Sequence, residues 1–132
     1  MSTQPVVLVV EDNPDVREML VVALRMWDYR VLTASNGVTG LGLVITEKPD
    51  VILLDVLMPE MSGEEFIHNL ANEVRDIPII VITALTDVAR LERLWSLGVK
   101  QVVHKPFRLA ALQEHLLSVK AAMYSLSSCV YR

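Results

Sequence analysis

The sequence has little cysteine and no excess of positive charge. Its single cysteine, Cys129, excludes an internal disulfide framework and a zinc site built from several cysteines, and it fits a reducing compartment. Twelve Lys and Arg residues are outnumbered by sixteen Asp and Glu residues, which gives a net charge of -4. The chain as a whole therefore does not attract a phosphate backbone, and direct binding to nucleic acid is not expected.

Long apolar runs are also missing. The apolar runs at 6–10, 51–54 and 77–82 are far shorter than the roughly 20 residues that a membrane-spanning helix needs. The first five residues contain no Lys or Arg of the kind that opens a secretory signal peptide. Together with the cysteine usage, these features predict a cytoplasmic protein that does not insert into a membrane.

Several familiar catalytic and binding motifs do not occur. Neither G-x-G-x-x-G nor G-x-x-x-x-G-K-[ST] is present, so a glycine-rich cradle for a nucleotide has no support. The sequence G-x-S-x-G is absent too, which argues against a Ser-His-Asp hydrolase.

What the chain does contain is a regular alternation of short apolar runs and amphipathic segments. Its 132 residues, 52% of them apolar, are enough for one domain with a sizeable core. Continuous β-branched runs indicate strands covered on both faces, while apolar residues three and four apart indicate helices. The expected strands are 6–10, 29–34, 51–54, 77–82 and 101–104, and a helical pattern follows each of them.

The helical patterns differ in strength. The second is weak, with Val38, Leu41 and Ile45 at helical spacing, and the last is long, from about 109 to 123. Five β and five α segments in strict alternation predict an α/β fold, in which a parallel sheet with right-handed crossovers carries helices on both faces. We expect one domain over residues 1–124 and a tail over 125–132.

Polar side chains follow the apolar runs at four expected strand ends. They are Glu11 and Asp12, then Asp55, Thr83 and Lys105. Because the carboxyl ends of parallel strands share one edge of a sheet, these residues are expected to meet there. Any one of these acids alone is best explained as an ordinary loop residue, but the set predicts a functional site.

The chemistry of such a site follows from its parts. Three carboxylates at one edge repel one another and are costly to remove from water, and a divalent cation is the simplest remedy. Ligands that are all oxygen favour Mg²⁺. A carboxylate beside a metal, a Lys and a hydroxyl can attack phosphorus and form an acyl phosphate, so we expect phosphoryl transfer.

Four motifs make the chain resemble the receiver domain of two-component response regulators over about residues 6–117. They are Glu-Asp-Asn at 11–13, Asp-Val-Leu-Met-Pro-Glu-Met-Ser-Gly at 55–63, Ile-Thr-Ala at 82–84 and Lys-Pro-Phe at 105–107. Each motif is weak alone. Their order is highly specific, as are the intervals of 43, 28 and 22 residues that separate Asp12, Asp55, Thr83 and Lys105 in turn. The resemblance implies a flavodoxin-like fold with strand order 2-1-3-4-5.

The resemblance also implies an acceptor and a metal site. Asp55 would accept a phosphoryl group from a histidine kinase or a phosphotransfer protein. Mg²⁺ would be held by Glu11, Asp12 and Asp55, together with the backbone carbonyl of Leu57. Such a domain is a signalling switch and not an enzyme, apart from its own phosphorylation from small donors and its own dephosphorylation.

Two further residues receive roles from the resemblance. Thr83 would move to bond a phosphoryl oxygen, and Lys105 would pair with the phosphoryl group. The peptide between Lys105 and Pro106 would be cis.

One position departs from the receiver pattern. Receivers usually carry Tyr or Phe three residues before the Lys, whereas this chain has Val102, so readout of phosphorylation through an aromatic ring is not expected. Leu91 and Trp95, four residues apart, share a helix face that by resemblance adjoins Val102. We expect these three residues to form an apolar surface for a downstream protein or a homodimer. The alternative is that Trp95 belongs mostly to the core.

Two other functions stay open. A Mg²⁺-dependent phosphatase of the haloacid dehalogenase type would need a second Asp two residues after its nucleophile as general acid, and this chain has Leu57 there. A pseudo-receiver would be an interaction module that is never phosphorylated. The presence of every acid with Thr83 and Lys105 argues against it, while Val102 keeps it open.

Overall fold

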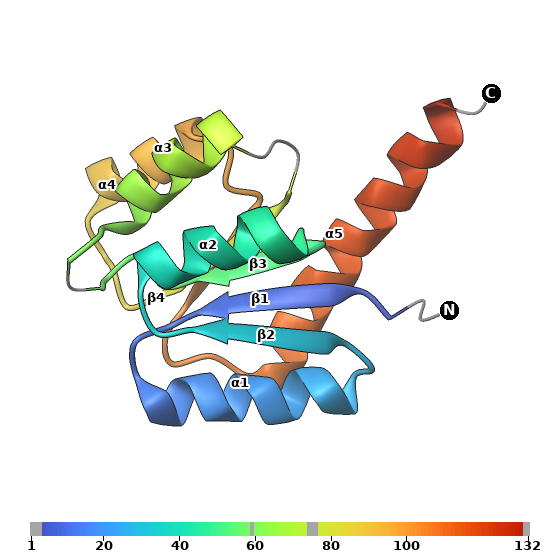
Figure 1. Cartoon of the computed structure of the whole chain (residues 1–132), viewed down its shortest axis with the longest axis horizontal. Coiled ribbons are helices and arrows are strands. Elements are labelled where there is room, and N and C mark those ends of the chain that lie inside the picture. The colour runs from blue at the N-terminus through green and yellow to red at the C-terminus, as the bar shows by residue number, and fades with distance from the viewer. Residues whose placement is uncertain (1–3, 59, 74–76, 131–132) are drawn as a thin grey trace.

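A five-stranded parallel sheet forms the centre of the computed structural model, which describes residues 4–58, 60–73 and 77–130 (Figure 1). The strands are β1 (Val6–Val10), β2 (Arg30–Ala34), β3 (Val51–Leu54), β4 (Ile79–Thr83) and β5 (Gln101–His104). The helices are α1 (Pro14–Met26), α2 (Gly37–Glu47), α3 (Gly63–Glu73), α4 (Val88–Ser96) and α5 (Leu109–Val130). The order of the strands is β2-β1-β3-β4-β5. The predicted α/β fold and its strand order are confirmed.

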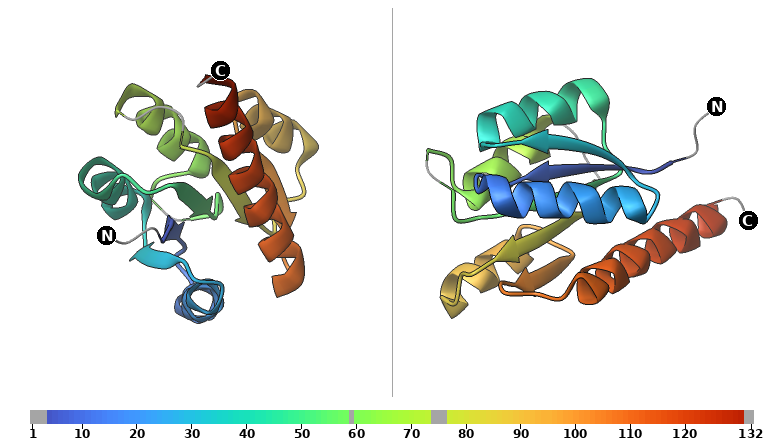
Figure 2. Two further views of the ribbon diagram at one scale, coloured as in Figure 1. Left: turned by 90° about the vertical axis from the view of Figure 1, so that its right-hand side faces the viewer. Right: turned by 90° about the horizontal axis from the view of Figure 1, so that it is seen from below.

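The sheet separates two apolar cores (Figures 1 and 2). On one face, α2, α3 and α4 contribute Val44, Phe66 and Leu94 to a cluster with the strands. On the other face, α1 and α5 contribute Leu24 and Leu116 to a second cluster. Both faces of β3 and β4 are buried along their whole lengths, which explains why these strands are continuous apolar runs instead of alternating ones.

Some boundaries differ from those expected. β4 begins at Ile79 and includes Thr83, so this threonine is the last residue of the strand and does not follow it. The last helix, expected to end at about 123, continues to Val130, and residues 131 and 132 of the expected tail lie outside the described residues. The end of α5 projects away from the sheet (Figure 1). Within the described part of the chain, no helix combines the length and the apolar character that crossing a membrane requires.

The second helix buries a different face from the one its apolar residues suggest. Val38 and Ile45 are 64% and 48% exposed, whereas Gly40 is buried. A Cβ atom at Gly40 would lie 3.0 Å from Val10 and 3.1 Å from Phe66, so α2 lies close to both β1 and α3. Periodicity misses this face because a glycine adds no apolar side chain to the pattern.

Candidate functional site

Hydrogen bonds between neighbouring strands bring the predicted site residues to one edge of the sheet. The backbone N–H groups of Glu11, Asp55 and Lys105 donate to carbonyl oxygens of the adjacent strands at 3.0, 3.0 and 2.8 Å. Each of these residues directly follows the end of a strand, so each bond continues the strand ladder by one step. The side chains therefore leave the sheet at the same edge, as the strand-end rule predicts.

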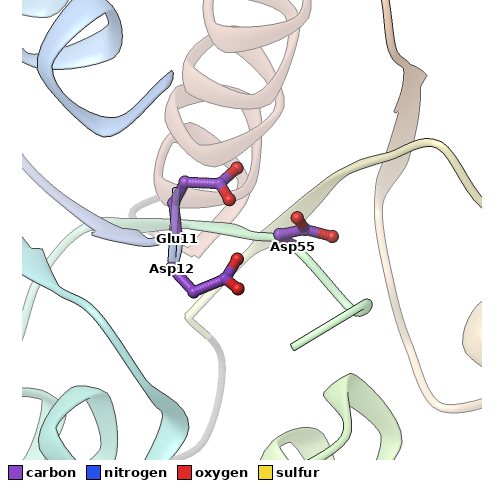
Figure 3. Close-up of side chains that lie close together, drawn as sticks. All are labelled: Glu11, Asp12 and Asp55. Atoms are coloured by element: carbon purple, nitrogen blue, oxygen red, sulfur yellow. The ribbon is translucent and has the colours of Figure 1, made fainter. Parts of the chain in front are cut away.

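Three acids meet at this edge. They are Glu11, Asp12 and Asp55, and Figure 3 shows their side chains together. One carboxylate oxygen from each residue lies within 4.8 Å of an oxygen of each of the other two. Glu11 and Asp55 are only 2% and 6% exposed. The predicted convergence of the acids is confirmed. Because all three donors are carboxylate oxygens, the cluster could hold a hard divalent cation such as Mg²⁺.

Lys105 joins two of these acids. Its Nζ donates to Glu11 Oε1 at 2.8 Å and to Asp55 Oδ2 at 2.9 Å. Burial lowers the pKa of Lys105, but its hydrogen bonds to the two carboxylates outweigh burial and raise the pKa above its ordinary value. Burial raises the pKa of Glu11, and the hydrogen bond from Lys105 offsets this only in part. One ammonium group therefore bonds two of the three acids, and the site still favours additional positive charge.

The second oxygen of Asp55 is held by the backbone. The N–H of Leu57 donates to Asp55 Oδ1 at 2.9 Å, while Oδ2 accepts from Lys105. The side chain of Leu57 is 42% exposed, so its bulk does not close the site from solvent. The sequence pointed to Leu57 only for its carbonyl group, and the role of its N–H in orienting Asp55 comes from the structure.

Thr83 lies next to Lys105 at the ends of β4 and β5. The threonine is fully buried, its Oγ1 accepts a hydrogen bond from the N–H of Leu85 at 3.1 Å, and its carbonyl accepts from the backbone N–H of Lys105. The peptide between Lys105 and Pro106 is cis, as the resemblance implied.

Two arginines near the site were not predicted from the sequence. Nη1 of Arg17 donates to the carbonyl oxygens of Glu11 and Asp12 at 2.9 and 3.4 Å, which ties α1 to the loop that carries these acids. Arg90 on α4 bonds Glu64 on α3 and the carbonyl oxygen of Val56. Arginines on the polar sides of helices are common, so nothing in the sequence pattern distinguishes these two.

The predicted partner surface is only partly as expected. Trp95 is 47% exposed, so the alternative that it lies mostly in the core is wrong. Leu91 and Val102 are half-buried and pack against the core on the α2–α3–α4 face of the sheet. A common surface made by all three residues remains a prediction.

Comparison with known proteins agrees with this geometry. A sequence profile described as the response regulator receiver domain matches residues 7–117. The chain belongs to the response regulator receiver family. Receivers are signalling domains of two-component systems, in which they interact with histidine kinases and downstream effectors, and they are generally not enzymes.

Individual relatives illustrate where receivers occur. The probable transcriptional regulator ycf27 of Guillardia theta is 38% identical over 122 residues, which cover 90% of this receiver and 46% of that protein. The sensor histidine kinase TmoS of Ectopseudomonas mendocina is 39% identical over 126 residues, covering 92% of this receiver and 13% of the kinase. This receiver thus spans less than half of either relative.

A solved structure supports the fold over nearly its whole length. The chemotaxis protein CheY4 of Vibrio cholerae superposes on this receiver with a TM-score of 0.83 at 29% sequence identity. The alignment covers 89% of this receiver and 99% of CheY4.

Proposed function

We propose that this receiver is a phosphoacceptor, which takes a phosphoryl group on Asp55 from a histidine kinase or a phosphotransfer protein and then switches an interaction surface. The setting of Asp55 carries this proposal. Its carboxylate is 6% exposed, lies within 4.8 Å of oxygens from Glu11 and Asp12, and accepts a hydrogen bond from Lys105 Nζ at 2.9 Å. Such a carboxylate is oriented by its hydrogen bonds and already lies beside a cation.

In the proposed step, a carboxylate oxygen of Asp55 attacks the phosphorus of a phosphohistidine. The new O–P bond forms as the P–N bond breaks, and the imidazole leaves with a proton from water, so that an acyl phosphate remains. Lys105 would pair with the negatively charged phosphoryl oxygens, because its compact ammonium group already lies within hydrogen-bonding distance of Asp55. Among the described residues, the Thr83 hydroxyl accepts from the N–H of Leu85 and donates to no other group, so its proton would be available to a phosphoryl oxygen.

The donors at this edge also suit the cation that we propose as cofactor. Glu11, Asp12 and Asp55, with the backbone carbonyl of Leu57, would hold Mg²⁺. When they are all ionised, three carboxylates and one ammonium group leave two negative charges, which one divalent cation balances. Bound there, the cation would neutralise charge on the transferring phosphoryl group.

Intact mass measurement tests the acceptor directly. After incubation with acetyl phosphate or a phosphoramidate and Mg²⁺, we expect the wild type to gain the mass of one phosphoryl group and Asp55→Asn to gain none. Asp28→Asn is the matched control, since Asp28 lies before β2 at the opposite edge of the sheet and has φ 68°, which asparagine tolerates.

Other results of the same measurement would contradict the proposal. No gain in the wild type would support a pseudo-receiver, and a gain that persists in Asp55→Asn would place the phosphoryl group elsewhere. Sustained turnover of a small phosphate ester would instead support a phosphatase.

We further propose that the switched surface lies on α4 and β5, around Leu91, Trp95 and Val102, and that it binds a downstream protein or a second copy of this receiver. The half-exposed indole ring of Trp95 supports this, because large aromatic side chains are enriched at interfaces. We also propose that this receiver is cytoplasmic, because its single cysteine fits a reducing compartment.

Replacing Trp95 with alanine should cost about 1 kcal/mol or less in free energy of unfolding, because half of the side chain already contacts water. Leu94 on the same helix is fully buried, and Leu94→Ala should cost about 2–5 kcal/mol. Urea denaturation measures both. Sedimentation of the phosphorylated protein should then show weaker self-association for Trp95→Ala if the partner is a second copy. Equal losses of stability in the two variants would count against an exposed recognition residue.

A further inference from the structure

Arg90 lies in the first turn of α4, and its guanidinium group forms hydrogen bonds with residues outside that helix. Its Nε and Nη2 donate to the two carboxylate oxygens of Glu64 at 2.5 and 2.9 Å, and Glu64 lies in the first turn of α3. The two side chains are only 23% and 21% exposed. The hydrogen bond from Arg90 lowers the pKa of Glu64, which favours the ionised carboxylate and a charge-assisted pair.

The same guanidinium group reaches the peptide beside the acceptor. Nη2 of Arg90 donates to the carbonyl oxygen of Val56 at 3.3 Å, and the N–H at the other end of that peptide, which belongs to Leu57, donates to Asp55 Oδ1 at 2.9 Å. The carbonyl and the N–H are parts of one rigid planar group. Arg90 and Asp55 therefore hold opposite ends of one peptide, and a cation on the carbonyl strengthens the N–H as a donor.

We propose that Arg90 is a positioning residue for the phosphoacceptor, which aims the Leu57 N–H at Asp55 and links the acceptor loop to α4. This role rests on the proposed function of Asp55. Phosphorylation of Asp55 changes the acceptor that the Leu57 N–H meets, and the change passes through one peptide to Arg90. Because Arg90 is part of α4, this chain of hydrogen bonds connects the site to the helix that carries Trp95. It does not need the aromatic side chain that receivers usually have at the position of Val102.

Arginine suits this position better than lysine. Three hydrogen bonds from one side chain, two to Glu64 and one to Val56, suit the fork of donors on a guanidinium group. The carbonyl of Val56 also accepts from the N–H of Gly63 at 3.3 Å, so both of its lone pairs are used and the peptide is held from α3 as well as from α4.

Arg90→Met tests the role, with Arg93→Met as the matched control, since Arg93 is an exposed cation one turn later on α4. In Arg90→Met, we expect the proton resonance of the Leu57 amide to move upfield because its hydrogen bond to Asp55 weakens. Phosphorylation by acetyl phosphate with Mg²⁺ should slow about two- to tenfold, as the loss of one hydrogen bond in the network implies. Amides of α4 should also respond less to phosphorylation. Arg93→Met should resemble the wild type in all three measurements.

Two further variants separate positioning from simple stability. Arg90→Lys keeps the charge but loses the fork, and it should behave like Arg90→Met. Glu64→Ala frees the guanidinium group and should shift the Leu57 amide in the same direction. A wild-type amide shift and rate in Arg90→Met would overturn the proposal, as would full rescue by lysine. The mass of the wild type tests the acceptor role of Asp55 independently of Arg90. If Asp55 is not an acceptor, the wild type gains no mass.

Discussion

Lys105→Met is expected to destabilise the receiver by about 2–3 kcal/mol when Mg²⁺ is absent, and added Mg²⁺ should restore much of the loss. The lysine is the counter-ion of two carboxylates that are 2% and 6% exposed, and removing one partner of a buried pair leaves uncompensated charge. We place the loss below the 3–5 kcal/mol of a fully buried pair because the lysine side chain is 22% exposed. Urea denaturation at neutral pH, with and without Mg²⁺, measures the effect.

Lys100→Met is the matched control for this experiment. Lys100 is exposed and directly precedes β5, at the opposite edge of the sheet from the acids, and its backbone N–H donates to the carbonyl oxygen of Ile79. Its replacement should change stability by about 0.5 kcal/mol or less, with no dependence on Mg²⁺. In the acceptor assay, Lys105→Met should slow phosphorylation about 100-fold, as removal of an aligned charge from a transfer site does. Equal stability of the two variants would show that Lys105 does not compensate the acids.

The edge of the sheet that holds the site could be predicted because it depends on few features. Buried parallel strands are continuous apolar runs, and their ends are marked by the first polar residue. Four such ends placed Asp55, Thr83, Lys105 and the Glu11–Asp12 pair at one edge without any knowledge of packing. The family resemblance added the roles of these residues, which no spacing alone supplies.

Contacts between helices could not be predicted in the same way. The bond from Arg90 to Glu64 joins residues 26 positions apart on two helices, and neither has a sequence signal beyond its charge. The burial of Gly40 depends on the shapes of Val10 and Phe66 against it, which periodicity does not contain. Features of the sheet follow from local patterns, whereas the links that position the acceptor follow from tertiary packing.

Gly63→Ala should have the second large effect, because it disturbs the peptide next to the acceptor. A Cβ atom at Gly63 would lie 2.2 Å from Val56 Cγ1 and 2.7 Å from Val56 Cα, so the backbone itself must move. We expect a loss of about 1–3 kcal/mol in stability from overpacking. Phosphorylation should slow by up to about 100-fold, because displacing the Val56–Leu57 peptide misplaces Asp55.

Gly42→Ala supplies the comparison that separates crowding from the mere loss of a glycine. A Cβ atom at Gly42 meets nothing within 4 Å, and the residue lies inside α2, so alanine should stabilise the receiver by about 0.5–1 kcal/mol. Its phosphorylation rate should be that of the wild type. Urea denaturation and the intact mass assay distinguish the two variants. If Gly63→Ala were phosphorylated as fast as Gly42→Ala, the geometry of the Val56–Leu57 peptide would not control the acceptor, and the role assigned to Arg90 would lose its basis as well.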